Sequence, residues 1–484
     1  MKAKQLVASR CRYVLVSKSS DWLLWLTLSA SLLLGGCSVT EPPPAEESLA
    51  TTLPESTHVQ ESWLATTDTG KVDDGWLKGF NDPRLEELVS EVMVSNQSIR
   101  AVAAQVDAAA ALAVQAGSAL KPTVGLAAGT SSADASGLPT NLQSSNAFLS
   151  VSWELDIWGR VRAGAAAGEA GYEATKADYE FARQSLVAQT AKAWFLATQI
   201  GGQKALAEET VDIYRRLLDL VESRAQVGKA QPQDLPLAKA NLAGAQSNLR
   251  RINASHKEIL RSIEVILGRY PSGRLAGATE FVALMPHVPA GLPAEILARR
   301  PDLIAAERRL AAAFFGSQQA EAARLPKISL TASAGGVDSG LANVLGLSNP
   351  ISAIGADLFA PLYAGGALKA GVDVADAQQK AALAVYGQTV LQAFKDVETA
   401  LSNEELFRER EQYLQAVLAE SAEAYRITEA QYEVGRVDLL SLLQTQTALL
   451  SAKSSLIAIR NERLAQRVDL HLALGGSFEE AGKN

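Results

Sequence analysis

Cysteine and histidine are scarce in this chain of 484 residues, and their scarcity argues against several classes of protein. The two cysteines, Cys11 and Cys37, are too few for a disulfide-stabilised scaffold or a cysteine-rich metal site. The four histidines lie far apart and have no metal-ligand spacing: His58, His256, His287 and His471. The sequence also has no Gly-rich phosphate loop and no nucleophile elbow. It therefore predicts no catalytic centre, no metal site and no cofactor.

Strong positive charge and long apolar runs are missing as well. The net charge is −8 and no basic block occurs, so nothing points to nucleic acid as a partner. After the N-terminal segment, no stretch of about 18 strongly apolar residues predicts a transmembrane helix. The nearest candidate, 101–120, is mostly alanine and contains Gln105 and Asp107, so we expect a closely packed soluble helix. If the chain crosses a membrane, strands must do it.

The N-terminus has the pattern of a secretory signal, with basic residues before a short apolar run at 22–34. The run ends in Leu-Gly-Gly-Cys, which resembles a bacterial lipobox and implies cleavage before Cys37 and its lipidation. An ordinary signal peptide that happens to contain cysteine is the alternative. Cys11 lies inside the signal, so the mature chain would keep one cysteine, at its first position. Ser38 then implies sorting to the outer membrane, and the Pro-, Ser- and Thr-rich segment 38–57 an extended tether.

The chain contains an internal repeat. The segment LKPTVGL (120–126) matches RLPKISL (324–330) at an offset of 204 residues. After the next loop the offset becomes 207 and stays constant, which chance matches would not do. Pairs at this offset include Val227-Gly228 with Val434-Gly435, and Leu267-Gly268 with Leu474-Gly475. We interpret the pattern as an internal duplication.

Each half is predicted to contain a helix, two strands around a polar loop, a very long helix, a tight glycine turn and a returning helix. Apolar and polar residues alternate in 123–131 and 147–155, and again in 327–335 and 351–359, as in strands with one apolar face. Aromatic rings gather near the strand ends, as they do at bilayer interfaces: Phe148, Trp153, Trp158, Phe359 and Tyr363. Alternation alone leaves open a soluble four-stranded sheet packed on a helix.

Proline is absent from two long stretches, 159–227 and 366–434. Each predicts one continuous helix, because the helix interior excludes proline. About 69 residues at 1.5 Å each make a rod of roughly 100 Å. Gly201 and Gly202 mark a soft point in the first rod. No globular core covers a rod of this size, so it must pack lengthwise against other rods.

Leucine and isoleucine recur every seven residues along the returning helix predicted at 437–474. One stripe contains Leu443, Leu450, Ile457 and Leu464. The adjacent stripe contains Leu442, Leu449, Leu456 and Leu470, and Arg463 interrupts it. Two seams predict neighbours on both sides of the helix, as in a closed ring of coiled coils, whereas a single long coiled coil needs only one.

Four strands of about nine residues can span a bilayer when they are tilted, but they cannot close a barrel alone. An open strand edge is not tolerated in lipid, so copies must share one barrel. Two copies would give the smallest barrel, filled by side chains, whereas three would give twelve strands and a lumen. The long helices would then extend the barrel wall as a tunnel, with Trp158 and Gly159 near the join.

Four motifs resemble the outer membrane efflux protein family, the TolC/OprM-like factors, and within it the NodT-type lipoprotein branch. They are DGWLKGFNDPRLEELV (74–89), RRPDLIAAERRL (299–310), ELDIWGRVR (154–162) and VGRVDLLSLLQTQTALL (434–450). The resemblance covers nearly all of the mature chain. It implies a homotrimer, with a twelve-stranded outer-membrane barrel continuous with a periplasmic α-helical coiled-coil tunnel. Such a trimer is a passive exit duct for small molecules such as drugs, embedded in outer-membrane lipids.

The resemblance also implies two kinds of functional position. The turns at Val227-Gly228 and Val434-Gly435 match the tips that dock onto a periplasmic adaptor, which binds an inner-membrane transporter of the RND type. Leu440 and Gln444 match the periplasmic aperture, although relatives often have Asp where this chain has Gln444. Asp438 lies nearby, and a helix cap is the simpler interpretation of its position. A periplasmic or outer-membrane scaffold lipoprotein without a pore is the alternative function.

These observations divide the chain as follows. We expect a lipoprotein signal peptide at 1–36, a lipidated tether at 37–75, a first repeat at 76–275, a second repeat at 276–477 and a C-terminal tail at 478–484. The first repeat ends with a returning helix at 232–268, and the second opens with a helix at 301–325.

Overall fold

The structure is a computed structural model, and it describes part of the chain. The described residues are 39–53, 62–65, 70, 72, 74–133, 142–278, 280–283, 288–293, 295–339, 343–344 and 350–479. The predicted signal peptide and lipidation site at Cys37 lie outside these residues, as do His58 and His287. Two compact units are present: one contains 119–164 and 318–372, and the other contains 42–118, 165–317 and 373–484, in so far as these are described.

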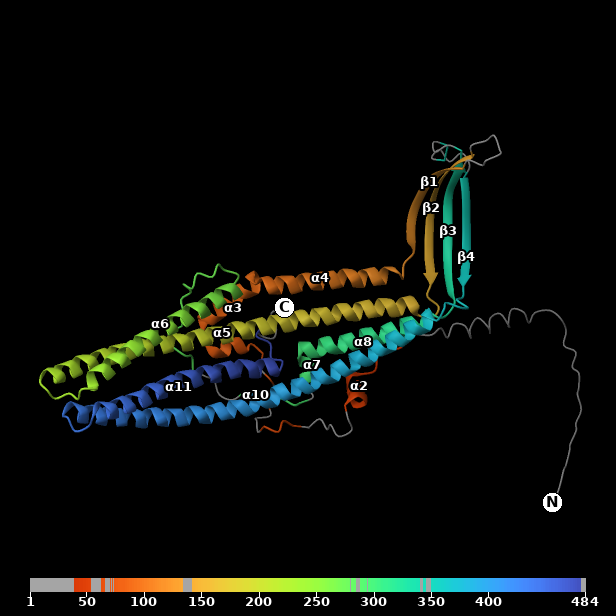
Figure 1. The fold of residues 1–484 in the computed structure, drawn as a ribbon. Helices are drawn as coiled ribbons and strands as arrows, with labels where there is room; N and C mark the ends of the chain where they lie inside the picture. Colours follow the sequence, from red (N-terminus) through yellow and green to blue (C-terminus); the bar gives the residue numbers. More distant parts are fainter. Residues whose placement is uncertain are drawn as a thin grey trace, which may run out of the picture. The chain divides into compact units, whose positions relative to one another are not determined.

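The first unit contains one antiparallel sheet, with the strands in the order β1-β2-β3-β4 (Figure 1). The strands are β1 (Thr123–Ala133), β2 (Leu142–Leu155), β3 (Lys327–Asp338) and β4 (Pro350–Phe359). The register places Val151 opposite both Val124 and Ala332, and Ala332 opposite Ile354. Because directly paired residues share a face, one face of the sheet is apolar. The other face is rich in Ser, Thr and Gly.

Strand β2 begins earlier than the alternation predicted, and β1 and β3 end later. Residues 142–146, which we expected in the loop between β1 and β2, pair with β1 as far as Ala133 opposite Leu142. These residues are LQSSN, which show no apolar alternation, so pattern alone could not assign them to a strand. The antiparallel hydrogen-bond ladder extends the strands instead, because it uses backbone groups whatever the side chain.

Long helices dominate the second unit. Helices α5 (Arg160–Gln226) and α10 (Ala367–Glu433) have 67 residues each, which corresponds to about 100 Å. Their returning partners are α6 (Asp234–Ile266) and α11 (Leu439–Ala473). The predicted soft point is absent, because α5 runs without a break through Gly201 and Gly202. A β-carbon at Gly202 would lie 3.4 Å from the Ile457 side chain, so this glycine accommodates close helix packing.

Shorter helices precede each strand pair and come in twos. The first pair is α3 (Pro83–Ser95) and α4 (Gln97–Ser118), and the second is α7 (Glu295–Arg299) and α8 (Pro301–Ala322). Helix α4 is the one described helix that is long and apolar enough to cross a membrane by length and composition, and only 6% of its most apolar window is buried. The close packing that we expected for 101–120 is therefore not provided within a single chain.

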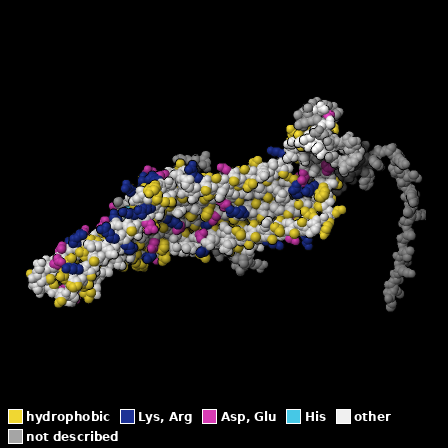
Figure 2. Space-filling view, turned by 45° about the horizontal axis from the view of Figure 1, so that its top comes forward, with side chains coloured by type: hydrophobic (Ala, Val, Ile, Leu, Met, Phe, Trp, Pro, Cys, Tyr) yellow, Lys and Arg dark blue, Asp and Glu magenta, His cyan; other side chains and the backbone are white. Residues whose placement is uncertain are grey.

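Apolar clusters hold the second unit together. One surrounds Trp194 and Phe195 of α5, another surrounds Tyr386 and Val390 of α10, and a third lies toward the turns that end α5 and α10. In the third cluster, Leu442 and Leu443 of α11 pack with residues of α5, α6 and α10. Neighbours within one chain thus contact both heptad stripes at this level. Apolar and charged side chains also alternate over the exposed surface of the helices (Figure 2).

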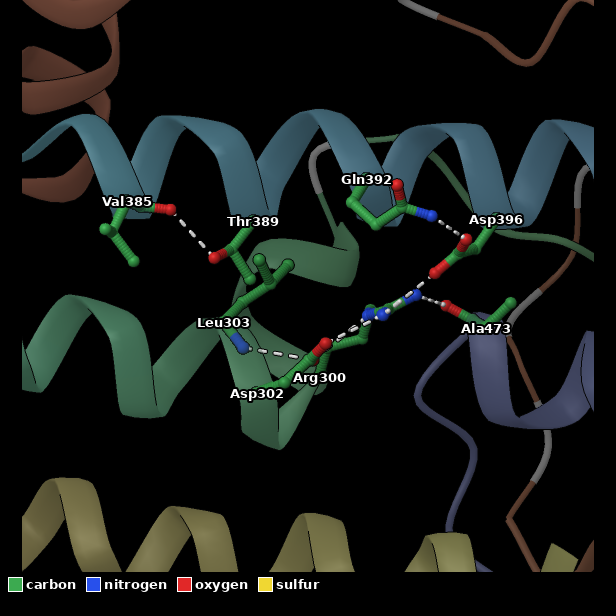
Figure 3. Close-up of polar contacts among 8 residues, drawn as sticks. All are labelled: Arg300, Asp302, Leu303, Val385, Thr389, Gln392, Asp396 and Ala473. Atoms are coloured by element: carbon green, nitrogen blue, oxygen red, sulfur yellow. Dashed lines mark hydrogen bonds and ion pairs between the residues drawn. The ribbon is translucent and has the colours of Figure 1, made fainter.

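Arg300 holds the break between α7 and α8. Its guanidinium donates to the Asp302 carboxylate at 3.1 and 2.8 Å and to the carbonyl oxygen of Ala473 at 3.1 Å, and it also faces Asp396 (Figure 3). Asn96 does the same between α3 and α4, donating to the carbonyl oxygen of Ile266 at 2.8 Å. Each polar side chain thereby satisfies a carbonyl near the end of a returning helix, which has no partner within that helix.

Candidate functional site

The join between β2 and α5 is formed by residues of the segment ELDIWGRVR. Gly159 has a φ of 76°, a left-handed conformation that glycine adopts without strain. Asp156 then caps the helix, accepting from the backbone N–H groups of Val161 at 2.9 Å and Arg162 at 2.8 Å. Burial raises the pKa of this carboxyl group, but the two backbone hydrogen bonds outweigh burial and the pKa is lowered. The strand therefore passes into the helix through a fixed, charged turn.

Two tryptophans lie at the base of the sheet. The indole N–H of Trp153 donates to the carbonyl oxygen of Leu120 at 3.1 Å, and that of Trp158 donates to the carbonyl oxygen of Pro326 at 2.7 Å. Both side chains are 37% exposed. An amphipathic ring with a bonded polar edge and an exposed apolar body suits a membrane–water interface.

The turns that end α5 and α10 have the same backbone geometry. Gly228 and Gly435 are left-handed, with φ values of 69° and 77°. In the first turn, the Gly228 N–H donates to Ala225 and the Lys229 N–H to Arg224, which is the Schellman pattern. The second turn repeats it one offset later. Val227 and Val434 precede the glycines and are 66% and 70% exposed. All four residues predicted as docking tips therefore lie in exposed, rigid turns.

Arg224 connects the two turns. Its guanidinium donates to the carbonyl oxygens of Tyr432 at 2.5 Å and Glu433 at 3.1 Å, and it lies 4.3 Å from the centroid of the Tyr432 ring. A cation at the C-terminal end of a helix satisfies its last carbonyls and complements its dipole. Sequence reasoning missed this contact. The available signal was an arginine in the last turn of α5, but its partner lies more than 200 residues away.

The predicted aperture residues lie in the first two turns of α11. Leu440 is 55% exposed, and Gln444 is also exposed. Asp438 is the N-cap residue of this helix, and its carboxylate accepts from the Ser441 N–H at 2.8 Å. Hydrogen bonds from the Ser441 side chain and backbone lower its pKa. The structure thus shows the cap, whereas Leu440 and Gln444 have side chains free to face a neighbour.

The N-terminal segment is more ordered than the tether that we expected. Residues 45–52 form a helix, α2 (Ala45–Thr52), whose Leu49 is buried against the α8–α10 side of the unit. Further along, the Glu398 carboxylate accepts from the backbone N–H groups of Leu64 at 2.8 Å and Ala65 at 3.2 Å. Composition predicted an extended chain, but burial of single apolar residues on a preformed helical surface orders it.

The described histidines have structural surroundings. His471 is buried and stacks on the Trp76 ring at a centroid distance of 5.6 Å. His256 lies on α6, where burial lowers its pKa. Within the described ranges, no three acidic, cysteine or histidine side chains are grouped so that they could hold a metal ion.

Comparison with known proteins assigns the chain. The sequence profile described as "Outer membrane efflux protein" matches residues 88–269 and again residues 292–476. This chain belongs to the outer membrane efflux protein family. Its relatives include the pyoverdine export outer membrane protein OpmQ of Pseudomonas aeruginosa, 30% identical over 93% of this chain and 96% of OpmQ. The toluene efflux pump outer membrane protein TtgC of Pseudomonas putida is 30% identical over 95% of this chain and 97% of TtgC.

Solved structures agree with this assignment. The outer-membrane channel OprN matches with a TM-score of 0.81 and 26% identity, over 91% of this chain and all of OprN. The MtrE outer membrane channel of Neisseria gonorrhoeae, in its open state, matches with a TM-score of 0.77 and 26% identity, over 92% of this chain and 100% of MtrE. This efflux protein is therefore an outer-membrane channel component of an efflux system, with a large periplasmic portion. The features described above are its candidate functional sites.

Proposed function

We propose that three copies of this efflux protein assemble into one barrel of twelve strands, continuous with a helical tunnel. Support comes from the sheet, because β1 pairs only with β2, and β4 only with β3, among the described residues. Both outer edges thus present unpaired backbone groups, which lipid does not tolerate. Pairing β1 of one copy with β4 of the next removes every edge. The apolar face, with Leu126 77% and Ile354 91% exposed, would then contact the acyl chains.

Each protomer would be a product of internal duplication. Three pairs of left-handed glycines share the offset of 207 residues: Gly159 with Gly366, Gly228 with Gly435, and Gly268 with Gly475. The contacts of Asn96 and Arg300 are related in the same way, since their acceptors Ile266 and Ala473 are also 207 residues apart. The two matches to the family profile give independent support.

The proposed function is passive export, with energy supplied by partners. The exposed tips around Gly228 and Gly435 would engage a periplasmic adaptor, and the adaptor an inner-membrane transporter of the RND type. Lipidation of Cys37 would anchor each protomer in the outer membrane. Leu440 and Gln444 would line the periplasmic aperture in three copies, and no residue is assigned a catalytic role. The names of relatives point to diverse cargo, and small molecules such as drugs form the proposed class.

Purification of the full chain in detergent tests the proposal. We expect a trimer that migrates at its full mass on a gel until it is heated, and stepwise conductance in a planar lipid bilayer. A monomer that never associates in membranes and gives no conductance would refute the channel and favour the alternative of a pore-free scaffold lipoprotein.

A further inference from the structure

Arg463 occupies a position in the heptad stripe of α11 where the repeat predicts leucine. The structure shows that it forms an ion pair with Glu411 of α10, whose side chain is only 10% exposed. Arg460, one turn earlier on α11, donates to the same carboxylate at 3.3 Å. Two guanidinium groups therefore share one carboxylate, and one unit of positive charge is left over. A pair that merely sets helix register would need a single arginine.

These charged groups line a cavity of about 570 Å³. Its wall also includes Phe281 and Ile457, and Glu280 contributes a second, exposed carboxylate. Small-molecule sites commonly have volumes of roughly 300–1,000 Å³, with apolar walls and a few polar groups. In addition, the Nε atom of Arg463 is buried and meets no acceptor within the described part of the chain. Leaving a buried donor unpaired is costly, so the surroundings favour an additional acceptor.

We propose that this cavity is a binding site for a small carboxylate ligand with an apolar body. The ligand's carboxylate accepts hydrogen bonds from Arg460 and Arg463, in the planar geometry that guanidinium groups favour. Its apolar body lies against Phe281 and Ile457. Glu280 repels a purely anionic ligand and therefore weakens its binding. The site is formed by α5, α10, α11 and the segment 280–283 of one protomer, so it does not depend on channel assembly.

Isothermal titration calorimetry on the full-length protein in lipid nanodiscs tests the proposal. The probe is 2-naphthoate, and the neutral 2-naphthamide serves as its control because the two share a ring system. We expect saturable binding of naphthoate, with no detectable binding of the amide. Affinity should fall about tenfold in Arg460→Gln, because a charge-assisted hydrogen bond is lost from a half-exposed side chain. It should rise in Glu280→Gln.

Arg410→Gln is the matched control, since Arg410 pairs with the exposed Glu462 at 2.8 Å and does not line the cavity. Its affinity for naphthoate should equal that of the unmodified protein. The proposal is overturned if naphthoate does not bind, if the amide binds equally well, or if Arg460→Gln and Arg410→Gln have the same effect. Conductance measured on the same samples keeps this result separate from a failure of the channel itself.

Discussion

Arg224 places its guanidinium 4.3 Å from the ring centroid of Tyr432 and donates to that residue's carbonyl oxygen at 2.5 Å. One side chain thus joins the turn after α5 to the end of α10. The contact combines a cation–π interaction with two hydrogen bonds to helix-terminal carbonyls. It therefore restrains the proposed docking tips relative to each other.

Replacement of Arg224 by alanine should release this restraint. We expect Arg224→Ala to raise single-channel conductance in planar bilayers, because the ends of the long helices can then separate. Arg215→Ala is the matched control, since Arg215 forms only an exposed pair with Asp212 on the same helix. Equal conductance in the two variants would show that the contact does not restrain the aperture.

A negative charge at Gln444 should change ion selectivity. If three copies of Gln444 face the lumen, Gln444→Asp creates a ring of carboxylates and raises cation selectivity, as charged rings do in pores. Reversal potentials under a salt gradient provide the measurement. The neutral variant Gln444→Asn should behave as the unmodified protein. An unchanged reversal potential in Gln444→Asp would place this residue away from the conduction path.

Asp438 permits a separation of capping from charge. Asp438→Ala removes the side chain that accepts from Ser441, and it should destabilise the start of α11 by about 0.5–2 kcal/mol. Asp438→Asn keeps a good cap without the charge, so thermal stability should be nearly preserved. If the cap is the whole role, cation selectivity in Asp438→Asn also stays unchanged. A large drop in selectivity with intact stability would instead assign Asp438 to the pore.

Gly335 should be indispensable to the sheet. A β-carbon there would lie 2.0 Å from the carbonyl oxygen of Ala147 on β2, far inside contact distance. Gly335→Ala should therefore separate β2 from β3 and abolish the heat-modifiable oligomer on gels. Gly125→Ala on β1 is the control, because its β-carbon would meet only the Ser150 hydroxyl at 3.6 Å. Normal assembly of Gly335→Ala would contradict the register described here.

His471 should make stability depend on pH. Burial, with a smaller contribution from the charge of Arg467, lowers its pKa to about 3, whereas an unfolded histidine titrates near 6.5. The unfolded chain therefore gains a proton that the folded chain does not, and stability falls as the pH drops below about 6.5 toward 3. His471→Phe should keep the stack on Trp76 and weaken this dependence. Parallel slopes for the two proteins, in unfolding temperatures between pH 7.5 and 4.5, would exclude it.

Sequence patterns located most elements of this protein because those patterns depend on local chemistry. Absence of proline predicted 159–227 as a helix, and α5 occupies Arg160–Gln226. Alternation placed the four strands, but it failed at 142–146, where backbone pairing rather than side-chain polarity decides the structure. Composition likewise predicted an extended tether where α2 forms, because the surface on which Leu49 is buried belongs to residues hundreds of positions away.

The sequence by itself determined the period of the helices, the positions of the glycine turns and the repeated order of elements. All of these follow from propensities within a few residues of chain. Only the tertiary structure decided that Arg224 bonds to the end of α10, that Arg463 and Arg460 share Glu411, and that Asp438 caps a helix. Long-range charge pairs leave no periodic trace in sequence. Their partners are chosen by the three-dimensional packing of rods, where a shift of one turn would bring a different side chain into contact.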